Sequence, residues 1–305
     1  MNTTCIVCKS RENKAVFREH EVDMLRCLKC GHVFSSWDTD QNYQAFWGES
    51  PIENEDQFWY NDAHSSMHDD FCQRFLDGKS GKLLDIGSGL GYFVKRASDC
   101  AGWTAYGYEI SPRAVEFART KLGLENVFAG RVEESHFAPA SFDIITLWDV
   151  VEHIPDPEPL LSYALTLLKS DGILFMHTPN INAQLPKARL KKLIRGMRED
   201  LHYIEAKDHV NIYSMSTLAK ILHRNGYTDF EFIHLRPVQS VSGSKSRLLK
   251  FAKNAWFHSS VALHRATLGA VNFDNLFVVA RKQNGEVGLR HSSLAGSSKT
   301  INTKL

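Results

Sequence analysis

Residues 82–93, which read Lys-Leu-Leu-Asp-Ile-Gly-Ser-Gly-Leu-Gly-Tyr-Phe, constrain the fold of this chain more than any other stretch. The apolar run Lys82–Ile86 predicts a buried strand, and three alternating glycines predict a tight turn before a helix that begins near Tyr92. Glycine lets a ligand approach the backbone closely, and the first turn of a helix offers unpaired N–H groups. Asp85 stands at the carboxyl end of this strand, the edge where open α/β sheets bind ligands. The stretch therefore predicts a ligand site at a strand–turn–helix junction.

A second acid, Glu109, ends the next predicted strand, Trp103–Ile110. A carboxylate at that place can accept hydrogen bonds from both ribose hydroxyls of a nucleoside. Predicted helices and strands then alternate: a helix from Ser111 to about Leu122, a buried strand over Phe142–Trp148, a helix over 158–168, a turn at Asp171-Gly172 and a strand over Ile173–Thr178. A later helix is expected to begin at Ser216. This alternation predicts a doubly wound α/β fold.

Four of the six cysteines form two pairs, Cys5-x-x-Cys8 and Cys27-x-x-Cys30, with 18 residues between the pairs. This spacing is typical of a four-cysteine zinc site, and in a reducing compartment it favours a metal over disulfides. Two reduced pairs in surface turns, or a redox pair, are the alternatives. The N-terminal residues therefore predict a zinc ribbon whose metal is structural, because four thiolates leave Zn²⁺ no open position.

The length, charge and composition of the chain limit the classes of protein to which it can belong. The chain has 305 residues, 43% of them hydrophobic, and a net charge of +1. That length suits one large domain with a small module, and the balanced charge gives no strong nucleic-acid or membrane signal. No apolar run reaches the roughly 18 residues of a membrane helix, and the N-terminus shows no signal-peptide pattern. We therefore expect a cytoplasmic protein of unknown oligomeric state.

An acid followed by alternating glycines resembles motif I of class I S-adenosylmethionine (SAM) methyltransferases, D-x-G-x-G-x-G, whereas a dinucleotide fold would show G-x-G-x-x-G. The paired cysteines, the acid of Tyr-Gly-Tyr-Glu-Ile-Ser and the stretch Phe142–Pro157 extend this likeness. Taken together, the chain resembles bacterial class I methyltransferases that carry an N-terminal zinc ribbon. The resemblance implies a Rossmann-like, seven-stranded α/β sheet, SAM as cofactor and a small-molecule substrate. Members of this group often methylate sugars or other intermediates of surface-polysaccharide and natural-product pathways.

The resemblance also implies a domain organisation. We expect a zinc ribbon over 1–36, connector or lid helices over 37–80, a methyltransferase domain over 81–282 and a disordered tail over 283–305. Helical insertions are expected at about 181–207 and 240–270. The second insertion contains a basic amphipathic helix, which could pack on its own domain or lie on a membrane surface or a partner.

The resemblance assigns the cofactor-binding residues by position. It implies that Glu109 holds the ribose and that Trp148 closes the pocket. The methionine end would be lined by Asp85, Gly87, Gly89 and Gly91, and the adenine by Ile110, Val132 and Glu133. Tyr92 is also expected among the cofactor-binding residues.

The stretch after the predicted strand Phe142–Trp148 carries the expected chemistry, in Asp149, Glu152 and His153. Histidine titrates near neutral pH, so His153 could act as general base on an acceptor hydroxyl. An equally open alternative is a histidine that only hydrogen-bonds its own loop. As an alternative, the spacing resembles the E-x-x-E-H metal site of quinone-biosynthesis and small-RNA methyltransferases. In that case Asp149, Glu152, His153 and His209 would hold Mg²⁺ or Mn²⁺, and the enzyme would be a quinone or RNA O-methyltransferase. A third possibility is a zinc-ribbon binding module on an inactive domain, which the intact Asp85, glycines and Glu109 argue against.

Overall fold

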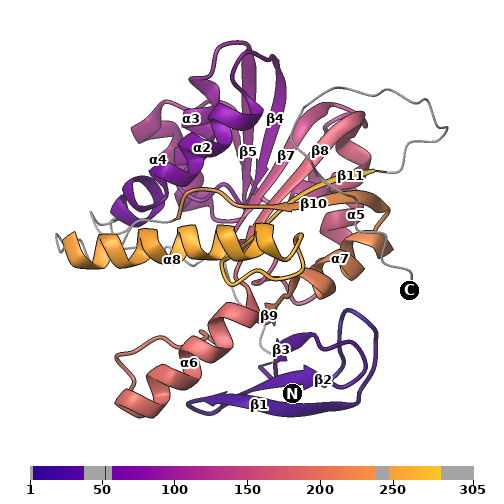
Figure 1. The fold of residues 1–305 in the computed structure, drawn as a ribbon. Coiled ribbons are helices and arrows are strands. Elements are labelled where there is room, and N and C mark those ends of the chain that lie inside the picture. The colour runs from indigo at the N-terminus through magenta and orange to yellow at the C-terminus, as the bar shows by residue number, and fades with distance from the viewer. Residues whose placement is uncertain (1–2, 38–51, 53–56, 238–246, 283–305) are drawn as a thin grey trace.

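The computed structural model describes residues 3–37, 52, 57–237 and 247–282 (Figure 1). A seven-stranded sheet forms the body, in the order β10-β11-β8-β7-β4-β5-β6. Neighbours from β8 to β6 run parallel, while β11 lies antiparallel between β8 and β10. The strands are β4 (Gly81–Ile86), β5 (Trp103–Glu109), β6 (Val127–Ala129), β7 (Phe142–Trp148), β8 (Leu168–Thr178), β10 (Tyr227–Ile233) and β11 (Leu276–Lys282). The predicted doubly wound α/β fold is confirmed.

Helices cover both faces of this sheet. Figure 1 shows α2 (Ser65–Phe75), α3 (Tyr92–Ser98) and α4 (Pro112–Leu122) on one side, and α5 (Glu158–Leu167) and α7 (Met215–Arg224) on the other. Parallel strands covered on both faces are apolar on both faces, which is why β7 could be read from its continuous apolar run. The bounds of α4 are as predicted, and both of its ends are capped. The Ser111 hydroxyl accepts from Ala114 N–H, and Gly123 ends the helix at a φ of 67°.

Two local predictions are wrong. Asp171-Gly172 does not form a turn before the strand but lies within β8, at an irregularity where the pairing with β7 jumps from Leu168 to Ile173. A Cβ at Gly172 would lie 3.0 Å from the Phe142 carbonyl oxygen, so the glycine serves a close approach between strands. Helix α7 is capped by Ser214 rather than Ser216. The Ser214 hydroxyl accepts from Thr217 N–H at 3.3 Å, and the Thr217 hydroxyl accepts from Ser214 N–H at 2.9 Å.

The N-terminal residues form a second sheet, which a strand from the main domain completes. Its antiparallel order is β1-β2-β3-β9, from β1 (Asn13–Glu19), β2 (Val22–Cys27), β3 (Val33–Ser35) and β9 (Asn211–Ile212). Helix α6 (Ile181–Arg195) lies against this sheet (Figure 1). A shared core joins Phe17 and Met24 of the sheet to Leu185 and Ile212. The N-terminal sheet is therefore packed on the main domain rather than hinged from it.

The remaining predicted segments are described only in part. Of the expected connector, the structure describes the π-helical turn η2 (Phe58–Ala63) and α2, while 38–51 and 53–56 lie outside the described residues, as does the expected tail 283–305. The basic helix is α8 (Arg247–Ala266), whose Trp256 ring lies 4.9 Å from the Lys187 ammonium. None of the helices within the described residues is both long enough and apolar enough to cross a membrane.

Candidate active site

A cavity of about 860 Å³ lies at the carboxyl ends of β4, β5, β7 and β8. Its wall is built from three parts of the chain that are far apart in sequence. The strand ends contribute Asp85, Glu109, Trp148 and His177; η2 and α2 contribute Tyr60, His64 and His68; and the segment 202–210 contributes residues that include Tyr203, Ile204 and His209. The predicted ligand site therefore exists as one continuous space.

The glycines after β4 have different roles. Gly87 has a φ of 74°, lines the cavity, and has no room for a side chain, because a Cβ would lie 2.6 Å from Val150 Cγ2. Gly89 also lines the cavity. Gly91, with a φ of 83°, faces α4 instead, where a Cβ would lie 2.8 Å from Ala118 and 2.9 Å from Leu124. We therefore assign Gly91 to helix packing rather than to the cofactor contact expected for it.

Two buried acids, Asp85 and Glu109, lie beside the glycine turn. Asp85 accepts a hydrogen bond from the Thr146 hydroxyl at 2.7 Å, and Glu109 accepts from the N–H groups of Gly89 at 2.8 Å and Ser111 at 2.9 Å. Burial, with the charge of Glu109 added, raises the pKa of Asp85 to about 8, and burial also raises the pKa of Glu109. A cationic ligand beside these groups would lower both pKa values, so this end of the cavity is suited to a positively charged molecule.

The other residues expected to bind the cofactor also line the cavity, namely Tyr92, Ile110, Val132, Glu133 and Trp148. The Trp148 ring is held in an aromatic cluster, 4.7 Å from Phe175 and 4.9 Å from His68 between ring centroids. Rings at these separations pack favourably and leave little freedom of movement. Trp148 therefore gives the cavity a rigid wall beside the glycine turn.

Asp149 lies between two histidines. Its φ is 52°, unusual for a residue with a side chain, and its carboxylate lies 3.0 Å from His177 Nδ1 and 3.8 Å from His64 Nε2. The Asn275 amide nitrogen lies 3.0 Å from His177 Nε2, the ring nitrogen on the other side from the one that meets Asp149. Burial alone would raise the pKa of the Asp149 carboxyl, but His177 and His64 hold that pKa well below its usual range.

Glu152, His153 and His209 form a cluster whose ligand atoms all lie within 4.8 Å of one another. His153 Nδ1 donates to the Asp208 carbonyl and His209 Nδ1 donates to the Ile204 carbonyl, each at 3.1 Å. Backbone carbonyls orient metal-binding histidines in this way.

Glu152 itself is fully buried and, unlike His153 and His209, does not line the cavity. One carboxylate oxygen accepts from the Thr178 hydroxyl at 2.9 Å, and the other, Oε1, is buried without a hydrogen-bond partner. Burial, together with the charge of Asp149, raises the pKa of Glu152 well above its ordinary value. A buried oxygen without a partner is costly, and a cation would satisfy it, so this donor set fits the metal site of the sequence-based alternative.

Sequence reasoning missed His64, His68 and His177 as cavity residues. His64 and His68 are four residues apart at the start of a predicted helix, which would have placed them on one helical face. His177 precedes the last residue of β8, at the strand edge where the other site residues lie. The four-residue spacing of His64 and His68 and the place of His177 near a strand end were the sequence signals available for these residues.

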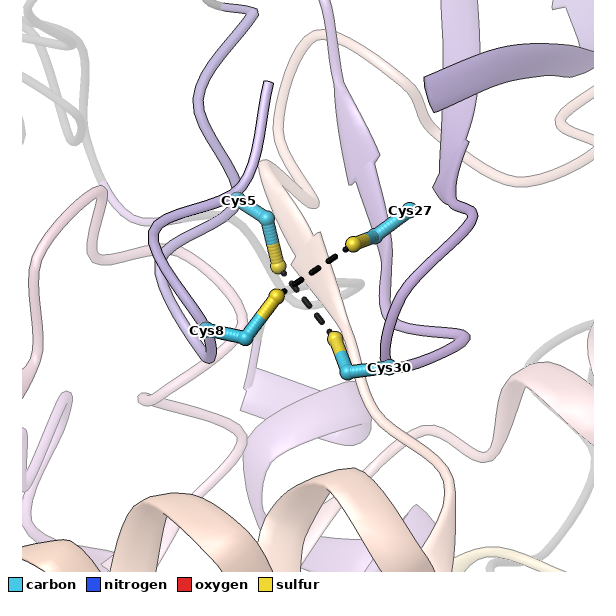
Figure 2. A group of neighbouring side chains, drawn as sticks. All are labelled: Cys5, Cys8, Cys27 and Cys30. Atoms are coloured by element: carbon cyan, nitrogen blue, oxygen red, sulfur yellow. Dashed lines mark hydrogen bonds between the residues drawn. The ribbon is translucent and has the colours of Figure 1, made fainter. Parts of the chain in front are cut away.

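The four N-terminal cysteines come together at the edge of the small sheet. Figure 2 shows their side chains pointing toward one another from two turns, and the sulfur separations are 3.5 Å for Cys5–Cys30 and 3.4 Å for Cys8–Cys27. Burial alone would raise the pKa of Cys27, but hydrogen bonds from the backbone at Cys30 and from the Cys8 thiol outweigh it and lower the pKa to about 7. The pairing of the two Cys-x-x-Cys motifs in space is therefore as expected for four ligands of one ion.

Comparison with known proteins identifies the family of this chain. The methyltransferase-domain family model matches residues 60–231. A ubiquinone biosynthesis O-methyltransferase of Neisseria meningitidis serogroup C is 28% identical over 46% of this chain and 63% of its own length. The enzyme of the same name from Actinobacillus pleuropneumoniae serotype 5b is 30% identical over 55% of this chain and 76% of its own length.

Among solved structures, phosphoethanolamine N-methyltransferase 2 of Haemonchus contortus in complex with SAM superposes with a TM-score of 0.53 at 17% identity, over 80% of this chain and 60% of that one. This likeness shows the class I methyltransferase fold. The family match spans the glycine turn, both buried acids and the Glu152 cluster. The chain therefore belongs to the methyltransferase-domain family and is a SAM-dependent methyltransferase.

Proposed function

We propose that this enzyme transfers the methyl group of SAM to a ring hydroxyl of a small, hydroxylated aromatic molecule of the quinone-precursor type. The observation that carries the proposal is the single cavity, which joins the acidic end at Asp85 and Glu109 to the cluster around His153. The names of the relatives support a quinone-type acceptor over the sugar acceptor first expected.

The acidic end would bind the cofactor. Asp85 would face the α-ammonium group of SAM, and Glu109 would accept hydrogen bonds from the ribose hydroxyls. Gly87 and Gly89 would let the methionine part approach the backbone, while Ile110, Val132, Glu133 and Trp148 would surround the adenine and close the pocket. All of these residues line the cavity, which supports the assignment.

Methyl transfer needs little covalent help from the protein, because the sulfonium is already an activated leaving group. The acceptor oxygen attacks the methyl carbon in line, the C–S bond breaks, S-adenosylhomocysteine leaves, and the hydroxyl proton must be removed. The protein has to hold the two atoms about 3–3.5 Å apart and exclude water. The wall formed by η2, α2 and the segment 202–210 would provide this enclosure.

The structure supports a metal-assisted reaction over His153 as general base. Burial and the nearby His209 lower the pKa of His153 to about 4. A phenolic hydroxyl has a pKa near ~10, so transfer of its proton to this imidazole would be uphill by roughly 8 kcal/mol. A divalent cation would act as a Lewis acid that lowers the pKa of the hydroxyl. Glu152, His153 and His209 would hold it, while Asp149, held by His177 and His64, would lie outside that ligand set.

We also propose that Cys5, Cys8, Cys27 and Cys30 bind one structural Zn²⁺ in a ribbon over residues 1–36. A tetrahedral site with bonds of about 2.3 Å requires sulfur separations near ~3.8 Å. The separations of 3.4 and 3.5 Å are close to that value.

A methyl-transfer assay with labelled SAM tests the proposal. Purified enzyme would be given catechol or UDP-glucose, each with and without added Mg²⁺. Methylation of catechol that depends on the divalent ion would support the proposal. Methylation of UDP-glucose alone would restore the sugar interpretation, and catechol methylation that resists brief EDTA treatment would return His153 to the role of base.

A further inference from the structure

The N-terminal sheet contains a buried acid whose hydrogen bonds reach the cavity wall. Glu19 is the last residue of β1, and 7% of its surface is exposed. Its Oε1 accepts from Tyr203 N–H at 3.0 Å, and its Oε2 accepts from Ile204 N–H at 3.1 Å and Ala206 N–H at 3.0 Å. Three backbone donors therefore converge on one carboxylate that comes from a distant part of the chain.

The segment that Glu19 holds forms part of the cavity. Tyr203, Ile204 and Glu205 line the cavity, and His209 follows within the same turn of chain. Glu205 has a φ of 62°, so this turn includes a conformation that side-chain-bearing residues seldom adopt. Such a conformation persists only where surrounding contacts enforce it. The three N–H groups that donate to Glu19 flank Glu205 on both sides. Their hydrogen bonds are therefore placed to enforce the conformation of Glu205.

A second contact from the same sheet fixes the far side of the turn. The Ser35 hydroxyl donates to the Ala206 carbonyl at 2.5 Å, and Ser35 N–H donates to the Val210 carbonyl at 2.9 Å. Directly after Val210, β9 pairs with β3. Segment 203–210 is thus tied to the N-terminal sheet at both of its ends.

The geometry points to Glu19 as a positioning residue of the active site. We propose that it fixes the turn 203–206, and through it His209 and the acceptor side of the cavity, from outside the methyltransferase domain. The SAM side rests on β4, β5 and the glycine turn, which Glu19 does not contact in the described hydrogen bonds. Loss of Glu19 should therefore weaken use of the acceptor and leave SAM binding unchanged.

Glu19→Gln is the informative substitution, because it keeps the shape and removes one acceptor oxygen. The glutamine amide group would direct its own N–H toward one or two of the three backbone donors. Glu21→Gln is the matched control, because it removes the same charge from an exposed residue. Glu21 lies in the turn that joins β1 to β2. Ser35→Ala removes only the hydroxyl that donates to the Ala206 carbonyl in the same turn. This variant replaces Glu19→Gln in the test if Glu19→Gln does not fold.

Three measurements test the inference, which rests on the proposed methyl transfer in this cavity. We expect the Kd of SAM to stay within twofold of wild type and kcat/KM for catechol to fall by about 10–100-fold, as expected for a misplaced wall. Hydrogen exchange at the amides of Tyr203, Ile204 and Ala206 should accelerate in Glu19→Gln and not in Glu21→Gln.

The outcomes separate the two proposals. A wild-type enzyme that methylates neither catechol nor UDP-glucose would contradict the proposed function, and the exchange data would still decide the role of Glu19. An active wild type with unchanged kcat/KM and unchanged exchange in Glu19→Gln would overturn the inference. So would an equal loss of SAM and acceptor binding, because that would indicate general destabilisation. If only Ser35→Ala folds, unchanged exchange at Ala206 in that variant would overturn it as well.

Discussion

Replacing Glu109 by alanine tests the cofactor site most directly. Its carboxylate accepts from the N–H groups of Gly89 and Ser111 and, in the proposed complex, from the ribose hydroxyls. The substitution therefore removes contacts to the ligand and to the protein at the same time. Measurements of SAM affinity and of protein stability separate these two losses.

The magnitudes follow from where the partners lie. Ser111 is fully buried, so its N–H would lose its partner at a cost of about 1–3 kcal/mol to folding. Gly89 is half-buried at the cavity, where water can replace the carboxylate. The ribose hydrogen bonds are charge-assisted, and losing them should cost about 1.5–3 kcal/mol of binding free energy. That loss corresponds to a Kd for SAM that is roughly 10–150-fold higher.

Isothermal titration calorimetry with SAM gives the Kd, and thermal unfolding of the unliganded protein gives the stability. Glu109→Gln should fall between wild type and Glu109→Ala, because it keeps one acceptor oxygen. Glu116→Ala, an exposed acid on α4, should change neither quantity. A folded Glu109→Ala protein that binds SAM within twofold of wild type would refute the reasoning and show that the ribose is held elsewhere.

Three further predictions follow from the described geometry. Because burial and the charge of Glu109 raise the pKa of Asp85 to about 8, cationic SAM must displace a proton at neutral pH. The affinity for SAM should rise by up to about tenfold per pH unit between pH 6 and 7. Calorimetry in buffers of different ionisation enthalpy should show that binding releases a proton. A SAM affinity that does not change with pH would exclude Asp85 as the ammonium partner. Purified protein should contain one zinc per chain by elemental analysis, and Cys27→Ser should lose the metal and solubility, whereas a folded, zinc-free wild type would contradict the ribbon. Finally, Glu152→Gln and His209→Ala should each reduce turnover to a similar extent if the two residues act as one unit. Added Mg²⁺ should restore activity to EDTA-treated wild type but not to either variant. Full activity in either variant would rule out the shared metal site.

The sheet was predictable because its signals are local. The apolar run of β7 and the caps of α4 need no knowledge of distant residues. One of the two errors arose where a contact distant in sequence decides the outcome. Gly172 looks like a turn residue, yet it is a glycine because β7 passes close by. Ser214 and Ser216 are equally good caps in sequence, and the reciprocal bond to Thr217 selects the first.

Residues of the site could be predicted from the sequence only where they belong to a recognisable motif. Asp85 and Glu109 stand at fixed places beside glycines, so their position at the cavity followed from the strand order. Glu19 gave no such signal, because a single acid at the end of an exposed-looking hairpin is usually solvated. Only the folded chain brings it to three amides near residue 205.

The two-residue strand β9 has a consequence for the order in which the protein assembles. His32, next to β3, bonds Asn211 across 179 positions of chain, and β3 cannot gain its outer neighbour until that region has been synthesised. Until then the edge of β3 presents unpaired backbone groups, which are prone to pair with other chains. The N-terminal hairpin can form early, but its final packing must wait for most of the methyltransferase domain, since contacts distant in sequence form slowly. Chains shortened before residue 211 should therefore aggregate through their first three strands, even where those strands are correctly folded.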